Sequence, residues 1–392
     1  MPRLASLRTS ETPSALSSRG LRIAFIGARG VGGTYSGIET YYEEVGSRLA
    51  ARGHQVTAYC RNHFTPAVSH YRGIEVRRLP TLRTKHFETA SHSLLSTVDS
   101  LRRGFDVVQY HAIGSAPLCF LPRLAGAATV VSVRGLDWQR AKWGWMARTA
   151  LRMGEWASAR LPTGTVVVSD TLRSHYREVH GREPHLIPNP VPPVERCGLG
   201  GFVDRGLEPR SYLLFAGRVS PEKHVHTLIE AAAPLLDRVQ LVIAGGSSHS
   251  DAYVSEVRAL GGDRVHFLGQ VDREAMRALL SNAFAFVLPS ALEGLSIGLL
   301  EALAYGNCIV ASDIPENREV VGGAGLYVPV GDAESLRETL ALLVREPDRA
   351  ARLRRRALER AAELPDWDRV AELTESFFFS CCRPDRVSRG RK

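Results

Sequence analysis

The sequence lacks the features that mark secreted disulfide scaffolds and membrane-spanning proteins. Its 392 residues include only six cysteines, with no Cys-x-x-Cys pair, so we expect reduced thiols. No apolar run approaches the roughly 18–20 residues that a membrane span needs. The first twenty residues are rich in Ser, Thr, Pro and Arg and contain no apolar run like that of a signal peptide. We therefore expect residues 1–20 to be disordered and the protein to be cytoplasmic.

Acidic residues are outnumbered by basic ones. The chain has 41 Asp and Glu against 50 Lys and Arg, which gives a formal net charge of +9. Such a balance favours anionic partners, such as nucleotide diphosphates, acidic lipid headgroups or nucleic acid. Because no RNA- or DNA-binding motif accompanies the charge, we expect no nucleic-acid partner.

Apolar strands alternate with helical segments along the whole chain. Strands are predicted over residues 21–26, 55–60, 74–79, 106–111, 129–133 and 165–168, and again over 212–216, 240–244, 265–268, 285–288, 308–311 and 325–328. Helices are predicted over residues 38–51, 89–102, 116–124, 143–159 and 171–179, then over 225–236, 273–281 and 299–305, with two more that start at 333 and 347. Apolar strands separated by helices predict parallel sheets that are covered on both faces. The fold class is therefore α/β with two Rossmann-like domains.

The proline-rich stretch that starts at residue 186 divides the two runs of strands and predicts a stiff linker. We expect domains over residues 21–189 and 211–365, joined by a linker over 190–210. A last helix over 366–380 is expected to cross back to the first domain, before a basic tail over 381–392. Ligands of parallel sheets bind at the carboxyl ends of the strands, so a site is expected in the cleft between the domains.

The first strand runs into a glycine-rich loop with the pattern Gly27-x-x-Gly30-x-Gly32. This pattern is not the G-x-G-x-x-G fingerprint of dinucleotide-binding proteins. The second strand also ends at Cys60-Arg61, where that fold would need an acidic residue for the ribose. We therefore expect a loop whose backbone approaches a ligand other than NAD.

Two stretches of the second half combine charge with a strand end. Residues 289–302 form a strand–loop–helix junction that contains Glu293 and Glu301, and the start of such a helix suits an anion. Arg218 and Lys223 lie five residues apart just after another strand, at a spacing that could clamp a diphosphate. The alternative for each stretch taken alone is an ordinary turn with solvated charges.

The complete motif set resembles glycosyltransferase family 4, a retaining family with the GT-B fold. The resemblance rests on Gly-Arg-x3-Glu-Lys over 217–223 and Pro-Ser-x2-Glu-Gly-Leu-x5-Glu-Ala over 289–302, and it covers residues 21–378. In the first half, the sequences of residues 35–40 and 134–143 are similar to the rhamnosyltransferase-like subgroup. That subgroup includes enzymes that build polysaccharide repeat units at the cell surface.

The resemblance implies a role for each matching residue. The nucleotide-sugar diphosphate would be bound by Arg218 and Lys223, the donor sugar by Glu293 and the nucleotide ribose by Glu301. Further donor contacts are implied for Gly33, for the backbone of Gly294, Leu295, Ser296 and Ile297, and for Gln270 and Val271 at the base. Since Arg and Lys supply the positive charge, no metal and no cofactor are expected.

One position departs from the family pattern. Many members have a histidine after the fifth strand of the first domain, where this chain has Arg134. Arginine stays protonated and cannot act as a base, although it can donate hydrogen bonds. His111 is a second candidate for the polar group on this side, and its alternative is a buried structural histidine. Two other readings stay open, a sugar-nucleotide epimerase and an inactive family member that acts as a scaffold or sensor.

Tryptophans are interspersed with basic residues over 138–160, in the first domain, which we expect to bind the sugar acceptor. A basic helix with tryptophans is typical of membrane surfaces. The expected partners are a nucleotide-diphosphate sugar, a glycan or lipid-diphosphate-linked sugar acceptor, and the anionic inner face of the cell membrane. The alternative is a helix that packs its aromatic side chains into the core.

Overall fold

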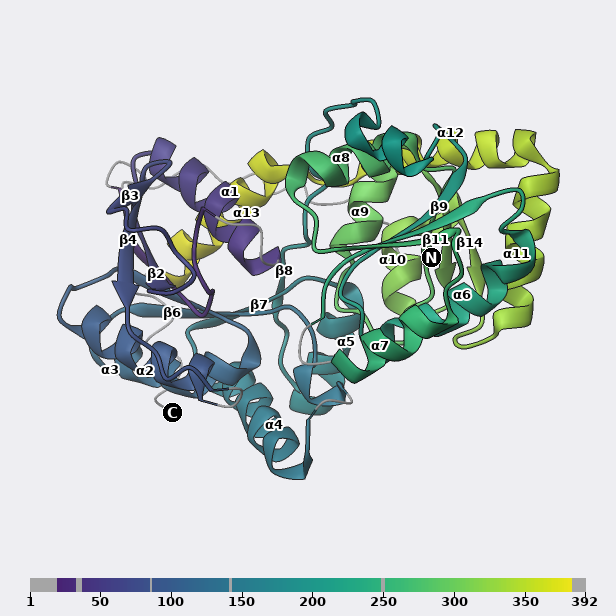
Figure 1. Cartoon of the computed structure of the whole chain (residues 1–392). Helices are drawn as coiled ribbons and strands as arrows, with labels where there is room; N and C mark the ends of the chain where they lie inside the picture. The colour runs from purple at the N-terminus through teal and green to yellow at the C-terminus, as the bar shows by residue number, and fades with distance from the viewer. Residues whose placement is uncertain (1–19, 33–36, 85–86, 141–142, 248–250, 383–392) are drawn as a thin grey trace.

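The computed structural model describes residues 20–32, 37–84, 87–140, 143–247 and 251–382. Gly33, which is expected to approach the donor diphosphate, lies outside the described residues. The chain forms two α/β halves side by side, each built around its own sheet (Figure 1).

The first half is built on an eight-stranded sheet in the order β3-β4-β2-β1-β5-β6-β7-β8. Its strands are parallel except β3, which pairs with β4 in the antiparallel direction. The strands are β1 (Arg22–Ile26), β2 (Gln55–Arg61), β3 (His70–Tyr71), β4 (Ile74–Leu79), β5 (Val107–His111), β6 (Ala128–Val133), β7 (Gly164–Val167) and β8 (His185–Leu186). The helices are α1 (Gly37–Ala51), α2 (Glu88–Leu101), α3 (Phe120–Leu124), α4 (Trp145–Arg160) and α5 (Asp170–His180).

The second half is built on a six-stranded parallel sheet in the order β11-β10-β9-β12-β13-β14. Its strands are β9 (Tyr212–Ala216), β10 (Gln240–Ala244), β11 (Val265–Gly269), β12 (Ala285–Leu288), β13 (Cys308–Ser312) and β14 (Gly325–Val328). Its helices are α6 (Val225–Ala232), α7 (Asp251–Leu260), α8 (Arg273–Asn282), α9 (Ile297–Ala304), α10 (Pro315–Val321), α11 (Ala333–Arg345) and α12 (Pro347–Glu363). The central strands β9, β12 and β13 are buried along their whole length because helices cover both faces of the sheet.

Some elements differ from the sequence expectation. The helix expected over 116–124 starts as a 3₁₀ segment, Ile113–Cys119, because Pro117 cannot continue a regular helix, and only α3 is α-helical. Helices α7 and α10 were not predicted. In α7 only Val257 is buried, so the helix presents almost no apolar face for the pattern to reveal.

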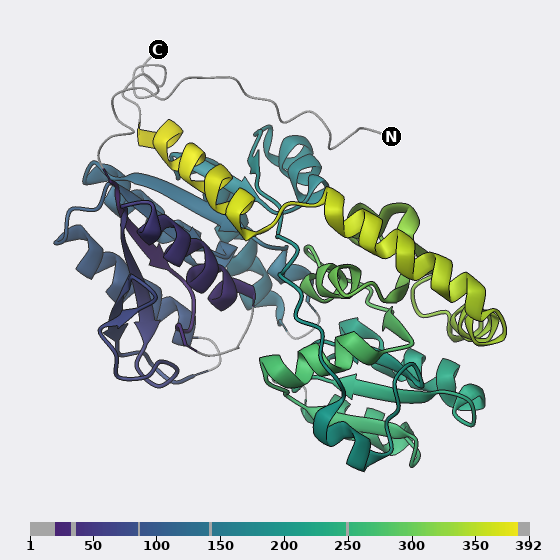
Figure 2. The same cartoon turned by 90° about the horizontal axis from the view of Figure 1, so that it is seen from above.

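Helix α13 (Trp367–Cys382) leaves the second half and packs against α1 of the first half (Figure 2). The Tyr41 hydroxyl lies 3.2 Å from the Thr374 hydroxyl, and Arg48 pairs with Asp368 at 2.8 Å. The helix was expected to end at 380, with Cys381 in a frayed tail. It instead continues to residue 382, because Cys381 is buried against the sheet with Phe377 and Phe378.

The two halves also contact each other through helix ends. The Glu319 carboxylate of α10 accepts hydrogen bonds from the backbone N–H groups of Asp170 (2.7 Å) and Thr171 (3.3 Å) at the start of α5. A carboxylate in this position satisfies backbone donors that the helix itself leaves unpaired. Among the described residues, no helix has both the length and the apolar character that crossing a bilayer requires.

Candidate functional site

A narrow cleft lies where the carboxyl ends of the two sheets meet. Its walls are the loop after β6 in the first half and the loops after β9 and β12 in the second. The lining residues are Gly135, Leu136, Arg140, Arg218, Glu222, Lys223, Leu292, Glu293 and Gly294. The structure therefore brings together Arg218, Lys223, Glu293 and Gly294, which the sequence motifs singled out separately.

Lys223 and Glu293 form an ion pair inside this cleft. The Lys223 ammonium lies 2.5 Å from Glu293 Oε1, and the two side chains are 13% and 9% exposed. Lys223 ends a short 3₁₀ turn, and the backbone N–H of Ala291 donates to the Glu222 carbonyl at 2.9 Å. This backbone bond holds the loop after β9 against the loop after β12, so the pair is formed by two fixed loops.

Arg218 is a second cation in the cleft, and it forms no ion pair or hydrogen bond through its guanidinium with any residue that the structure describes. Burial lowers the pKa of its guanidinium, and the nearby charge of Arg140 lowers that pKa further. Three carboxylates, those of Glu222, Asp137 and Glu293, act in the opposite direction. An anion bound beside the two arginines would offset their mutual repulsion.

The starts of two helices meet beside the cleft. A side-chain carbon added at Gly37, the first residue of α1, would lie 2.1 Å from the Ile297 side chain at the start of α9. The Ser296 hydroxyl caps α9 by accepting from the Leu299 N–H at 3.3 Å. Because helix starts carry partial positive charge, this junction adds to the anion-attracting character of the region.

Glu301 lies on α9, one turn beyond this junction. Burial raises the pKa of its carboxyl to about 7, with Arg273 opposing the shift. Its carboxylate accepts no hydrogen bond from the described residues. Arg273 also lies 3.9 Å from Glu43 of the first half, so the region around Glu301 borders both halves.

Gln270 and Val271 directly follow β11, at the same edge of the second sheet. Gln270 is exposed and Val271 is half-buried. They are not among the residues that line the cleft. Their contact with a nucleotide base stays a prediction.

Arg134 bridges the two halves of the protein. Its guanidinium donates to Asn189 Oδ1 at 2.5 Å, and Asn189 Nδ2 donates to the Leu295 carbonyl at 3.1 Å. The guanidinium also lies 4.4 Å from the centre of the Tyr41 ring. Sequence reasoning missed Asn189, whose only signal was its place between Pro188 and Pro190.

His111 is fully buried at the end of β5. Its ring lies 5.0 Å from that of Tyr41 and 4.9 Å from that of Tyr42, and neither ring nitrogen has a hydrogen-bond partner among the described residues. Burial, followed by the charge of Arg134, holds the pKa of His111 well below its usual value. The imidazole is therefore neutral. Its role in catalysis stays a prediction.

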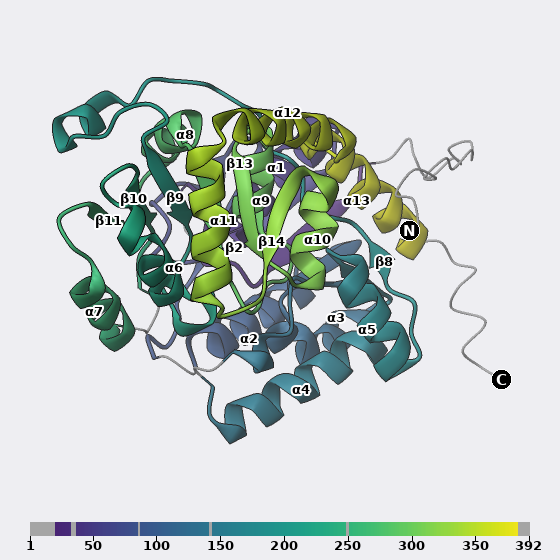
Figure 3. The same ribbon diagram turned by 90° about the vertical axis from the view of Figure 1, so that its right-hand side faces the viewer.

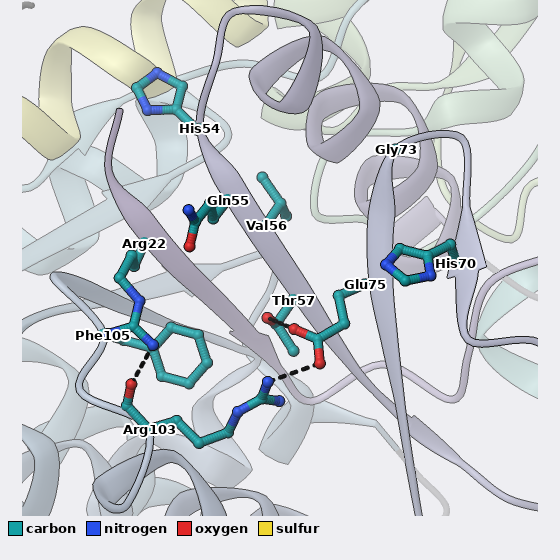
Figure 4. A pocket seen from close by; sticks show the side chains of 10 residues that line it. All are labelled: Arg22, His54, Gln55, Val56, Thr57, His70, Gly73, Glu75, Arg103 and Phe105. Carbon is teal, nitrogen blue, oxygen red and sulfur yellow. Dashed lines mark hydrogen bonds and ion pairs between the residues drawn. The ribbon is translucent and has the colours of Figure 1, made fainter. Parts of the chain in front are cut away.

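A separate cavity opens at the amino ends of the first-sheet strands, at the opposite edge from the cleft (Figure 4). Its charged groups already have partners, since Arg103 pairs with Glu75 at 2.7 Å and Thr57 donates to Glu75 at 2.9 Å. Arg22 donates to the Gly104 carbonyl at 2.9 Å. These side chains are therefore already paired with the protein itself, and we interpret the cavity as a structural feature of this sheet edge.

An Asp-x-Asp sequence, which in other proteins holds a metal-bound diphosphate, occurs at residues 366–368. Here Asp366 accepts a hydrogen bond from the Arg369 N–H at 2.8 Å, and Asp368 pairs with Arg48. Both carboxylates therefore take part in starting α13 and fixing it to α1.

Two family profiles match this chain. "Glycosyltransferase Family 4" matches residues 35–195, and "Glycosyl transferases group 1" matches residues 204–360. The chain is 33% identical to "D-rhamnosyltransferase WbpZ" of Pseudomonas aeruginosa over 163 residues, and this alignment covers 40% of this chain and 42% of that protein. It is 29% identical to "Alpha-maltose-1-phosphate synthase" of Mycobacterium tuberculosis over 260 residues, and this alignment covers 61% of this chain and 66% of that protein. The chain thus spans less than two thirds of the length of these relatives.

The fold resembles that of sucrose-phosphate synthase from Thermosynechococcus elongatus. The two structures superpose with a TM-score of 0.79 at 23% identity, over 92% of this chain and 98% of that one. This agreement confirms the GT-B fold expected from the sequence. Because the two family profiles together cover both halves, the chain belongs to the glycosyltransferases that join a Family 4 domain to a group 1 domain.

Proposed function

We propose that this protein transfers a sugar from a nucleotide-diphosphate donor to a glycan or lipid-linked glycan acceptor, with retention of the anomeric configuration, in cell-surface polysaccharide synthesis. The observation that carries the proposal is the convergence of Arg218, Lys223 and Glu293 in one cleft between the halves. In this proposal the two cations bind the diphosphate, and Glu293 beside them accepts hydrogen bonds from sugar hydroxyls.

In the proposed mechanism, Arg218, Lys223 and the start of α9 stabilise the negative charge that develops on the leaving diphosphate. The donor sugar becomes oxocarbenium-like, and the acceptor hydroxyl attacks from the face that the diphosphate leaves. The departing phosphate oxygen takes the acceptor proton. Because arginine and lysine supply the positive charge, this chemistry needs no metal ion.

Helix α4 supports a membrane-bound acceptor. It projects from the lower side of the molecule in Figures 1 and 3. Trp145, Met146, Met153 and Trp156 are 78%, 68%, 60% and 51% exposed, so these aromatic and apolar side chains do not pack into the core. Arg148 and Arg152 are exposed on the same helix. Such a surface suits the interface of an anionic bilayer, where a lipid-diphosphate-linked sugar would be presented.

The test of activity is a panel of nucleotide sugars incubated with the purified chain and a lipid-linked acceptor fraction. Nucleotide-activated D-rhamnose is the first donor to test, because one relative carries that name. Release of nucleotide diphosphate with a new glycosidic bond is expected without any added divalent metal ion, and NMR of the product reports its anomeric configuration. An inverted product would contradict retention. Donor binding without transfer or hydrolysis would favour the inactive scaffold, and an altered sugar nucleotide without acceptor would favour the epimerase.

Membrane binding is tested by flotation with vesicles that contain acidic phospholipid. Binding is expected to weaken as salt rises, because the attraction between arginines and headgroups is screened. The double change Trp145→Ser and Met146→Ser should reduce binding, whereas Leu260→Ser, at an exposed apolar position of the second half, should not. Equal binding of both variants would remove α4 from the proposal.

A further inference from the structure

Three potential metal ligands converge between α4 and α5, outside the donor cleft. Nε2 of His175 lies 2.7 Å from Glu155 Oε1, and Nε2 of His180 lies 2.8 Å from the same oxygen. One ligand atom from each of these three residues lies within 4.8 Å of the other two. Glu155 comes from the inner face of α4, and both histidines come from α5.

The cluster is enclosed. The side chains of Glu155, His180 and His175 are 5%, 10% and 26% exposed. A carboxylate taken out of water at this depth needs strong partners, because an unpaired buried charge is costly. Two imidazoles are the partners of its Oε1 atom. The more exposed His175 leaves one side of the cluster open to water.

This set of ligands is of the kind that zinc and related first-row divalent ions prefer. Zinc binds nitrogen and carboxylate oxygen at about 2.0–2.2 Å, which in a tetrahedral site separates ligand atoms by about 3.3 Å. The imidazole nitrogens would therefore have to move away from Glu155 Oε1 by only about 0.5 Å. Two nitrogens and one oxygen leave the fourth position for water.

The second oxygen of the carboxylate is also held. Trp138 Nε1 donates to Glu155 Oε2 at 2.6 Å. Ligating carboxylates commonly accept such an outer hydrogen bond, which fixes their orientation. Trp138 belongs to the loop that leads from Gly135 to Arg140, and both of these residues line the donor cleft.

We propose that Glu155 Oε1 and the Nε2 atoms of His175 and His180 bind one divalent transition-metal ion of the zinc type, with water as the fourth ligand. The ion ties α4 to α5 and, through Trp138, fixes the loop that forms one wall of the cleft. This role is structural. It is independent of the proposed transfer reaction, whose diphosphate charge is met by Arg218 and Lys223.

The test uses the chain without a histidine tag, after treatment with EDTA and removal of the chelator. Titration with ZnCl₂ in a calorimeter should show one site that is lost on changing the cluster. Zinc at 100 times its Kd should raise the melting temperature by about 5 °C. Titration with CoCl₂ should produce the visible absorption of tetrahedral cobalt bound to nitrogen and oxygen.

The variants are Glu155→Gln and His180→Gln, with His266→Gln as the matched control. His266 is a matched control because its Nε2 also lies at hydrogen-bond distance from a side-chain oxygen, Oε1 of Gln240, at 2.6 Å. It lies in the second half of the chain. We expect each cluster variant to weaken zinc binding at least 100-fold and the control to bind as the parent does. The cobalt spectrum needs only the unaltered chain, so it decides the question even if a variant fails to fold. A parent chain that gives no tetrahedral cobalt spectrum and no zinc-dependent stabilisation would overturn the proposal, as would parent-like binding by folded His180→Gln.

Discussion

Lys223 and Glu293 form an almost completely buried ion pair between the two second-half loops that line the cleft, with Lys223 Nζ 2.5 Å from Glu293 Oε1. A diphosphate bound at Lys223 would compete with Glu293 for the ammonium. Glu293 would then be released to accept hydrogen bonds from the donor sugar. Under the proposed function, the pair would connect diphosphate binding with sugar recognition in a single contact.

Lys223→Ala tests this connection. Under the proposed function, it removes one cation from the leaving group and leaves Glu293 as an unpaired buried charge, so we expect kcat/KM to fall by at least about 100-fold. Arg238→Ala, at an exposed position of the same half, should change kcat/KM little. Steady-state rates on the identified donor and melting curves together make the measurement. Near-parental turnover by folded Lys223→Ala would sink the assignment of Lys223.

Glu301 should give donor binding a dependence on pH. Its pKa of about 7 is above that of a free carboxyl, so the group is partly protonated near neutrality. If Glu301 accepts hydrogen bonds from the nucleotide ribose, the ionised form binds more strongly, and affinity should rise as pH increases from 6 to 8. Calorimetry with an intact nucleotide sugar measures this, because the diphosphate of such a donor does not titrate in that range. The Glu301→Gln variant should bind the nucleotide sugar more weakly, and its affinity should no longer depend on pH. If the variant keeps the pH dependence, another group must cause it.

Gly294 is required by the contact between the halves. A side-chain carbon at this position would lie 1.9 Å from the Arg134 carbonyl oxygen. Gly294→Ala should therefore force the halves apart and weaken the Asn189–Leu295 hydrogen bond, at a cost of about 1–3 kcal/mol of unfolding free energy. Gly262→Ala is the control, because nothing lies within 4 Å of the added carbon there. Chemical denaturation of both variants makes the comparison, and an equal effect would mean that the contact is not tight in solution.

His111 should make stability fall in mild acid. Its pKa in the folded chain is well below the value of about 6.5 expected when unfolded, so the unfolded state takes up the proton first. The stabilisation is fully present above pH 6.5. It is lost as pH falls toward the folded pKa, by up to about 1.4 kcal/mol per pH unit. Buried His92, with its pKa lowered to about 4 by burial and Arg61, acts in the same direction.

Urea unfolding between pH 7.5 and 5 measures this slope, and His111→Gln should reduce it. The same variant examines the predicted catalytic role of His111. A catalytic His111 would make kcat/KM collapse at pH 7.5 even where the variant remains folded. A purely structural one would leave turnover within a few-fold of the parent.

The fold was largely readable from the pattern of apolar residues. Strands β9, β10, β12 and β14 have the bounds expected, because each is a short apolar run between turn residues. Helices with little buried surface, such as α7, were missed, because periodicity reports only a face that packs against something. The extent of α13 was also missed, because its last residues, Cys381 and Cys382, pack against the core of the first half, which the local sequence does not reveal.

The residues of the candidate site also fall into two groups, those that sequence motifs identify and those that only the folded structure identifies. Arg218, Lys223, Glu293 and Glu301 could be named in advance, because each belongs to a recognisable motif that follows a strand. Asn189 could not be, since its importance comes from touching Arg134 on one side and Leu295 on the other. His175 and His180 are five residues apart, and regular helices bring together side chains three or four apart. Only the packing of α4 beside α5 places both rings at Glu155.

The sequence by itself determined the two parallel sheets, the family and the charged residues at the strand ends, since local periodicity and motif spacing encode all of these. Only the tertiary structure decided which of those charges meet. It pairs Lys223 with Glu293, leaves Arg218 opposite Arg140, and engages Arg134 in the bridge between the halves. The physical reason is that burial and pairing depend on residues more than fifty positions apart, whose distances are fixed only when the two halves pack together.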